Sequence, residues 1–198
     1  GGQLTWTDGS HVVRLPMVVR PVALAAPVAV YGTGDPISYN VTFGYTGPFT
    51  ATARGLVPAV TEPGSVNTGE QVYYEVTIPA GTTYARFSLF DTHVSPASDL
   101  DLYVYNSGGT QVGGSGSGTS NEEVNLLNPA AGLYYVEVDG YATADPSTFT
   151  LFYWLLDSTD AGNMTVSAPS TATTGAIGTI NLSFTGLAAA TKYLGSVA

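Results

Sequence analysis

The seven residues from Asp99 to Tyr105 alternate strictly between aliphatic side chains and polar or aromatic ones. A period of two predicts a β-strand with two different faces. The face that we expect to line a core carries Leu100, Leu102 and Val104; the opposite face carries Asp99, Asp101, Tyr103 and Tyr105. Asn106 and the glycines that follow it favour a tight turn. The stretch therefore predicts a strand, a hairpin turn and a returning strand.

The composition of the whole chain also favours strands and turns over helices. Of its 198 residues, 24 are Gly and 13 are Tyr, and only 10% are charged. No uninterrupted apolar run reaches the length that spans a membrane. Five basic residues against fifteen acidic ones leave a net charge of −10, which would repel phosphate backbones and anionic lipid headgroups. We expect an all-β chain with no nucleic acid and no membrane as partner.

Short strands are predicted at close intervals in the middle of the chain. They cover residues 71–78, 83–90, 99–105, 110–113, 123–127, 133–138 and 148–155. This spacing predicts an antiparallel β-sandwich or jelly roll. A Pro/Gly/Thr loop is expected over 60–69, and the Gly/Ser tract 113–120 is expected to be a mobile loop because it lacks an apolar anchor.

Further strands are predicted on both flanks of this block. They cover residues 4–6, 11–14, 37–43, 49–54, 164–166, 178–184 and 192–197. The run from Ile180 loosely echoes the run from Asn40, so we expect the flanks to pair as a second small β-sandwich-like unit. The predicted segments are 1–20, 21–60, 61–157 and 163–198.

Two stretches resemble known families. The run Leu4-Thr-Trp-Thr-Asp-Gly-Ser-His-Val-Val-Arg-Leu-Pro-Met-Val-Val is similar to the closing strands of the fibronectin-like domain that follows the catalytic domain in many subtilisin-like serine proteases. From about Gln71 to Leu156 the chain resembles the bacterial pre-peptidase C-terminal domain. The residues that carry this second resemblance are Asp99-Leu-Asp-Leu-Tyr-Val-Tyr, the Gly-rich loop, Glu122-Glu123, Pro129-Ala-Ala-Gly-Leu-Tyr-Tyr-Val-Glu-Val-Asp-Gly-Tyr141 and Phe149-Thr-Leu-Phe-Tyr153.

These resemblances imply a non-catalytic C-terminal region of a secreted, extracellular subtilisin-like serine protease. Its partner would be the catalytic domain of the parent protease, which it would stabilise or position. The subtilase Asp, His and Ser blocks are missing, as are Gly-x-Ser-x-Gly and His-Glu-x-x-His, so no catalytic residue is expected. The start at Gly1, with no basic and apolar leader, suggests a mature fragment of a longer precursor.

Three aspartates, Asp91, Asp99 and Asp101, are candidate calcium ligands. Asp91 ends one predicted strand and Asp99 begins the next, so the intervening loop returns the chain to the same end of the sandwich. Calcium takes six to eight oxygen ligands, relatives of the family often bind it, and it would stabilise a chain without cysteine. The alternative is that these carboxylates are a solvated strand face and a turn residue. Weaker candidates are Asn106, Asp139 and Asp145.

Four tyrosines are candidates for a different site. If Tyr103, Tyr105, Tyr135 and Tyr141 share an exposed face, they would dock a polymeric substrate, either fibrous protein or polysaccharide, because tyrosine offers a rigid apolar ring with a polar tip. The alternative is ordinary cross-strand aromatic pairing, which stabilises a sheet by roughly 0.2 to 1 kcal/mol per pair.

Overall fold

The computed structural model describes residues 2–17, 21–144 and 146–198. Within these ranges the regular structure is β-strand, with one 3-10 turn, η1 (Asp91–His93). The predicted all-β fold class is confirmed. Contacts divide the chain into two compact units, one of Gly1–Ala51 with Ser167–Leu182 and one of Thr52–Val166 with Ser183–Ala198.

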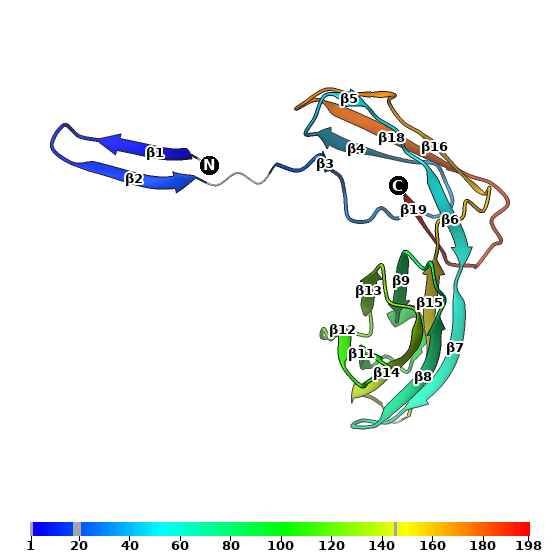
Figure 1. Cartoon of the computed structure of the whole chain (residues 1–198). Helices are drawn as coiled ribbons and strands as arrows, with labels where there is room; N and C mark the ends of the chain where they lie inside the picture. The colour runs from blue at the N-terminus through cyan, green and yellow to red at the C-terminus, as the bar shows by residue number, and fades with distance from the viewer. Residues whose placement is uncertain (1, 18–20, 145) are drawn as a thin grey trace. The chain divides into compact units, whose positions relative to one another are not determined.

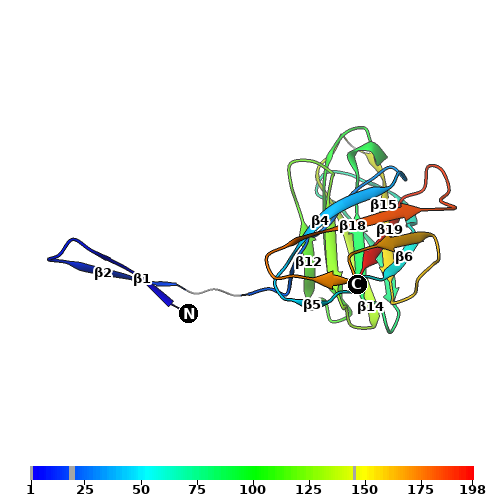
Figure 2. The same ribbon diagram turned by 90° about the horizontal axis from the view of Figure 1, so that it is seen from above.

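The first unit contains a hairpin and a small antiparallel sheet. The hairpin is β1 (Gly2–Thr7) with β2 (Val12–Met17), and the second strand includes Pro16. The small sheet has the order β18 (Ile177–Phe184), β4 (Ile37–Phe43), β3 (Leu24–Ala25), and β5 (Gly47–Pro48) pairs with β17 (Thr171–Ala172). Strands β4 and β18, far apart in the sequence, lie side by side (Figures 1 and 2). The division of the chain into the segments 1–20, 21–60, 61–157 and 163–198 remains a prediction.

The second unit is a sandwich of two antiparallel sheets (Figure 1). One sheet, here called the β11 sheet, has the order β12 (Gln111–Ser115), β11 (Asp99–Asn106), β14 (Gly132–Ala142), β8 (Gln71–Ile78). The other, the β15 sheet, has the order β10 (Val94–Ser95), β15 (Ser147–Leu156), β9 (Tyr84–Ser88), β13 (Glu123–Leu127), and β7 (Val60–Val66) also pairs with β15. The unit further contains β6 (Ala53–Pro58), which pairs with β19 (Tyr193–Val197), and most of β16 (Met164–Ser167).

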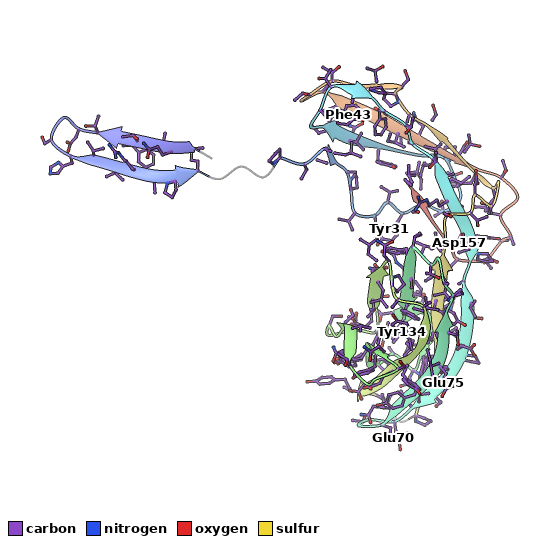
Figure 3. The ribbon with its side chains drawn as sticks, in the orientation of Figure 1. Tyr31, Phe43, Glu70, Glu75, Tyr134 and Asp157 are labelled. Carbon is purple, nitrogen blue, oxygen red and sulfur yellow. The ribbon has the colours of Figure 1, made fainter. Side chains whose placement is uncertain are left out.

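The core lies between the two sheets. Leu100, Leu102 and Val104 are completely buried in it, as the alternation of β11 predicts. The neighbouring strand β14 adds Tyr134, labelled in Figure 3, and the β15 sheet adds Phe87 from β9. One face of every core strand is thus committed to packing, which leaves only the other face available for binding.

The outer faces of the two sheets differ. On the β15 sheet Phe152, Trp154 and Leu156 form a second apolar cluster, against which Val57 of β6 and Leu194 of β19 pack. On the β11 sheet, by contrast, the outward side chain of Tyr73 is 57% exposed. The outer face of the β11 sheet is therefore accessible to a ligand.

The predicted loop over 60–69 is wrong, because residues 60–66 form β7. Pro63 and Gly64 indicated a loop, but β7 pairs with β15 and with no other strand of the described residues, and an edge strand tolerates proline because one side of it needs no donor. Gly64 is required for packing, since a Cβ there would collide with Phe149 and the hydroxyl of Tyr74. The strand predicted over 49–54 is also displaced, to β6.

The predicted Gly/Ser loop is held by a buried carboxylate. Glu122 is 1% exposed, and its side chain accepts hydrogen bonds from the hydroxyl of Ser115 and from the N–H and the hydroxyl of Ser117, the last two at 2.7 Å. Residues 113–115 belong to β12, and Ser120 is completely buried. Polar contacts thus anchor a tract that has no apolar anchor.

Candidate functional site

Asp99 and Asp101 lie at the start of β11, at one end of the β11 sheet. A bulge between them sets Asp99 opposite Ala142 and Asp101 opposite Asp139. Asp101 is 7% exposed, so it is not the solvated residue that simple alternation suggests. Its Oδ2 accepts a hydrogen bond from the hydroxyl of Tyr103 at 2.9 Å.

The electrostatic surroundings of Asp101 are acidic. Burial raises the pKa of its carboxyl group, the hydrogen bond from Tyr103 opposes this, and the charges of Asp99, Glu122 and Asp139 raise the pKa further. The Oδ1 atom of Asp99 is buried and has no hydrogen-bond partner among the residues that the structure describes. A bound cation would relieve both conditions.

The carboxylate of Asp91 has hydrogen-bond partners of its own. Asp91 is exposed, and its carboxylate accepts from the N–H of Ser120 at 2.8 Å and from the side-chain amide of Asn121 at 2.5 Å. The charge of Asp91 is not among those that raise the pKa of Asp101. Within the described ranges no group of three or more His, Asp or Glu side chains is arranged to hold a metal ion.

The weaker metal candidates have other roles or lie outside the described residues. Asn106 caps the turn after β11, because its Oδ1 accepts from the N–H of Gly108 and of Thr110, each at 3.0 Å. Asp139 accepts a hydrogen bond from the side-chain amide of Gln71 at 3.0 Å. Asp145 lies outside the described residues. Of the two described candidates, Asp139 is the one that lies opposite Asp101.

The outward residues of the β11 sheet form rows across its strands. In one row Glu137 of β14 lies between Tyr103 of β11 and Tyr73 of β8. In the next row Tyr135 lies between Tyr105 and Glu75. Four tyrosines and two glutamates therefore lie together on three neighbouring strands, and we call these residues, Tyr73, Glu75, Tyr103, Tyr105, Tyr135 and Glu137, the acid–tyrosine face.

An open hollow lies on the acid–tyrosine face. It has a volume of about 400 Å³ and is lined by Tyr73, Tyr105, Gly109, Tyr135 and Glu137. This volume falls near the lower end of the range of roughly 300 to 1,000 Å³ found for ligand sites. The structure thus brings two of the predicted tyrosines, Tyr105 and Tyr135, together with two residues that were not predicted, Tyr73 and Glu137.

The other two predicted tyrosines do not line the hollow. Tyr103 lies on the same face, and its hydrogen bond to Asp101 raises the pKa of its phenol to about 12. Tyr141 is 66% exposed in the last part of β14. Similarly, a hydrogen bond to Glu137 raises the pKa of Tyr73 to about 12. Tyr73 and Tyr103 therefore remain protonated donors at neutral pH.

Comparison with known proteins identifies the middle of the chain. Residues 70–140 match the family model described as "Bacterial pre-peptidase C-terminal domain", which confirms the resemblance seen in the sequence. The chain is also 34% identical over 140 residues to pyrolysin of Pyrococcus furiosus, a match that covers 68% of this chain and 10% of pyrolysin. The chain thus spans about a tenth of the length of that curated relative.

A solved structure that resembles the chain is the crystal structure of Aeromonas hydrophila PliG, a periplasmic lysozyme inhibitor of g-type lysozyme. The likeness covers 50% of this chain and 86% of PliG, at 14% identity and a TM-score of 0.36. A likeness this weak carries no conclusion about this chain. Within the described residues, no helix is both long and apolar enough to cross a membrane.

Proposed function

Since residues 70–140 form a bacterial pre-peptidase C-terminal domain, we propose that this chain is a non-catalytic, extracellular accessory region of a secreted subtilisin-like serine protease. The similarity to a stretch of pyrolysin supports this assignment. The chain would act on the catalytic domain of the same protein, by stabilising or positioning it. The family match is the observation that carries the proposal.

The absence of catalytic motifs is consistent with an accessory role. The subtilase Asp, His and Ser blocks are missing from the sequence, and a nucleophile, its base and an orienting group are needed together for acyl transfer. The purified chain is expected to hydrolyse neither casein nor a short chromogenic peptide. Turnover that co-purifies with the chain and resists a serine-protease inhibitor would contradict the proposal.

Calcium is the cation that we propose for the Asp99 and Asp101 end of the β11 sheet. The support is the buried Oδ1 of Asp99, which has no partner within the described part of the chain, and the raised pKa of Asp101, because calcium binds through carboxylate and carbonyl oxygens. Asp139 is the adjacent carboxylate, while Asp91 accepts hydrogen bonds from Ser120 and Asn121. Extracellular calcium modules bind at about 0.1 to 1 mM, and saturation at about 100 times the dissociation constant adds roughly 2.7 kcal/mol.

Calcium titration of the thermal unfolding midpoint tests this site. A rise in millimolar calcium, reversed by EDTA and lost in the Asp101→Asn variant, is expected. Magnesium serves as the control ion, because it demands a tighter octahedral geometry. Equal unfolding midpoints in calcium and in EDTA would mean that Asp99 and Asp101 do not form a calcium site.

A second candidate role is substrate targeting through the acid–tyrosine face. The observation that favours it is the open hollow, which three tyrosines line on a sheet face that is accessible to solvent. Binding of the chain to a protein polymer would support targeting, whereas the accessory role on the catalytic domain does not require it.

A further inference from the structure

The carboxylate of Glu137 lines the hollow and has no ion-pair partner among the described residues. Glu137 is 8% exposed, and its side chain lies near enough to the hydroxyls of Tyr73 and Tyr105 to contribute to the raised pKa of both. The ion pairs recorded between described residues join Asp8 to His11 and Glu123 to Arg86, so neither involves Glu137. A carboxylate has about four acceptor sites, so Glu137 can still accept hydrogen bonds from a ligand.

The charge around the hollow has one sign. Glu75, labelled in Figure 3, is exposed and lies beside Tyr135 on the neighbouring strand. The adjoining row of the sheet carries Asp101 and Asp139, and the charge of Asp139 contributes to the raised pKa of Tyr73 and of Tyr105. The field therefore favours a cation and opposes an anionic polysaccharide.

The rings that line the hollow add a second attraction for a cation. The faces of tyrosine rings attract a cation within about 6 Å of their centres. A guanidinium group suits the hollow better than an ammonium group, because it is planar, stacks on aromatic rings and donates two parallel hydrogen bonds to one carboxylate. The combination of three tyrosines and one buried carboxylate thus matches the chemistry of arginine.

We propose that the hollow binds the side chain of an arginine presented by a partner polypeptide. The hollow is open and lies across three strands, so the main chain that carries the arginine can cross the sheet face while the side chain enters. This inference deepens the second candidate role, substrate targeting, and is independent of the accessory role and of the calcium site.

The test is an NMR titration of the isotope-labelled chain with a blocked pentapeptide, Gly-Gly-Arg-Gly-Gly. Shifts are expected in the amide signals of Tyr73, Tyr105 and Glu137. The same peptide with citrulline in place of arginine keeps the shape and loses the charge, and it should bind at least about tenfold more weakly, a factor that corresponds to about 1.4 kcal/mol. Binding of the arginine peptide should also weaken as salt is raised. Free arginine amide should bind more weakly than the peptide, because it lacks the main-chain contacts.

Two variants and one control locate the site on the protein. Glu137→Gln removes the charge at nearly constant volume, and Tyr73→Ala removes an exposed ring, so neither disturbs the core. Each is expected to reduce the affinity about tenfold. Tyr141→Ala is the matched control, because Tyr141 is exposed on the same strand as Glu137 but does not line the hollow. The affinity of the Tyr141→Ala variant for the arginine peptide should equal that of the unaltered chain.

Several results would overturn the proposal. Equal affinity for the arginine and citrulline peptides would refute charge recognition. Unchanged binding by Glu137→Gln, or an equal loss in Tyr141→Ala, would place any binding elsewhere. If no amide signal shifts at about 10 mM peptide, any binding is weaker than about −3 kcal/mol, and the proposed site is refuted. The accessory role would not be affected, because it has its own test.

Discussion

Replacing Glu122 by alanine should destabilise the second unit through the loop before β13. The side chain is almost completely buried and accepts three hydrogen bonds from Ser115 and Ser117. Hydrogen bonds to a charged group contribute roughly 1.5 to 3 kcal/mol each. Ser117 is exposed, so water replaces part of that loss, and we discount each bond to about 1 kcal/mol. The expected loss of unfolding free energy is about 3 kcal/mol.

The loss should appear as a lower thermal unfolding midpoint. At roughly 3 to 4 °C per kcal/mol for a unit of this size, the midpoint should fall by about 10 °C. Calorimetry or circular dichroism of the full chain measures it. Glu122→Gln is the matched control, because its amide can accept from Ser117 and donate to the hydroxyl of Ser115, and it should lose less than half as much. A midpoint of Glu122→Ala within 2 °C of the unaltered chain, the margin of about 0.5 kcal/mol, would refute this reasoning.

Three further changes test the packing and charges of the second unit. Leu102→Ala should lower the free energy of unfolding by about 2 to 5 kcal/mol in a denaturant titration, because Leu102 is completely buried in the core; a loss below 1 kcal/mol would contradict its placement. Gly64→Ala should lower it by about 1 to 3 kcal/mol through overpacking against Phe149, whereas Gly118→Ala, which meets open space, should stay within about 0.5 kcal/mol. The folded-state pKa of Asp101 is raised above the pKa in the unfolded chain. The contribution of Asp101 to the free energy of unfolding is therefore fully present when the pH is below the unfolded-state pKa, and it is lost as the pH rises through the folded-state pKa. In EDTA, Asp101→Asn should therefore be more stable than the unaltered chain at pH 7 and gain nothing at pH 3; a loss at pH 7 would contradict the sign.

The sequence was sufficient to predict the strands whose patterns are local. The alternation of β11 placed Leu100, Leu102 and Val104 in the core, because one buried face imposes a period of two on a strand. Prediction from the local sequence failed for β7, where Pro63 and Gly64 indicated a loop. The reason is that the pairing of β7 with β15 brings together residues about 90 positions apart, and a propensity argument takes no account of such pairing.

The candidate site was only partly predictable for a similar reason. Tyr105 and Tyr135 could be proposed as outward-facing residues from the pattern of each strand. Their meeting with Tyr73 and Glu137 depends on the register of three strands, which no single strand specifies. Glu122 was missed because a charged residue is rarely expected in a buried position, and only the Ser-rich tract before it hinted at hydrogen-bonding partners.

The most direct test of the accessory role compares the longer protease that we propose with a version that lacks residues 22–198. The two quantities are kcat/KM on a short chromogenic peptide and the half-life of activity at a temperature near the unfolding midpoint. The account predicts an unchanged kcat/KM and a half-life at least about fivefold shorter, the ratio expected from losing roughly 1 kcal/mol of kinetic stability. An unchanged half-life, or a collapse of kcat/KM on the short peptide, would contradict it.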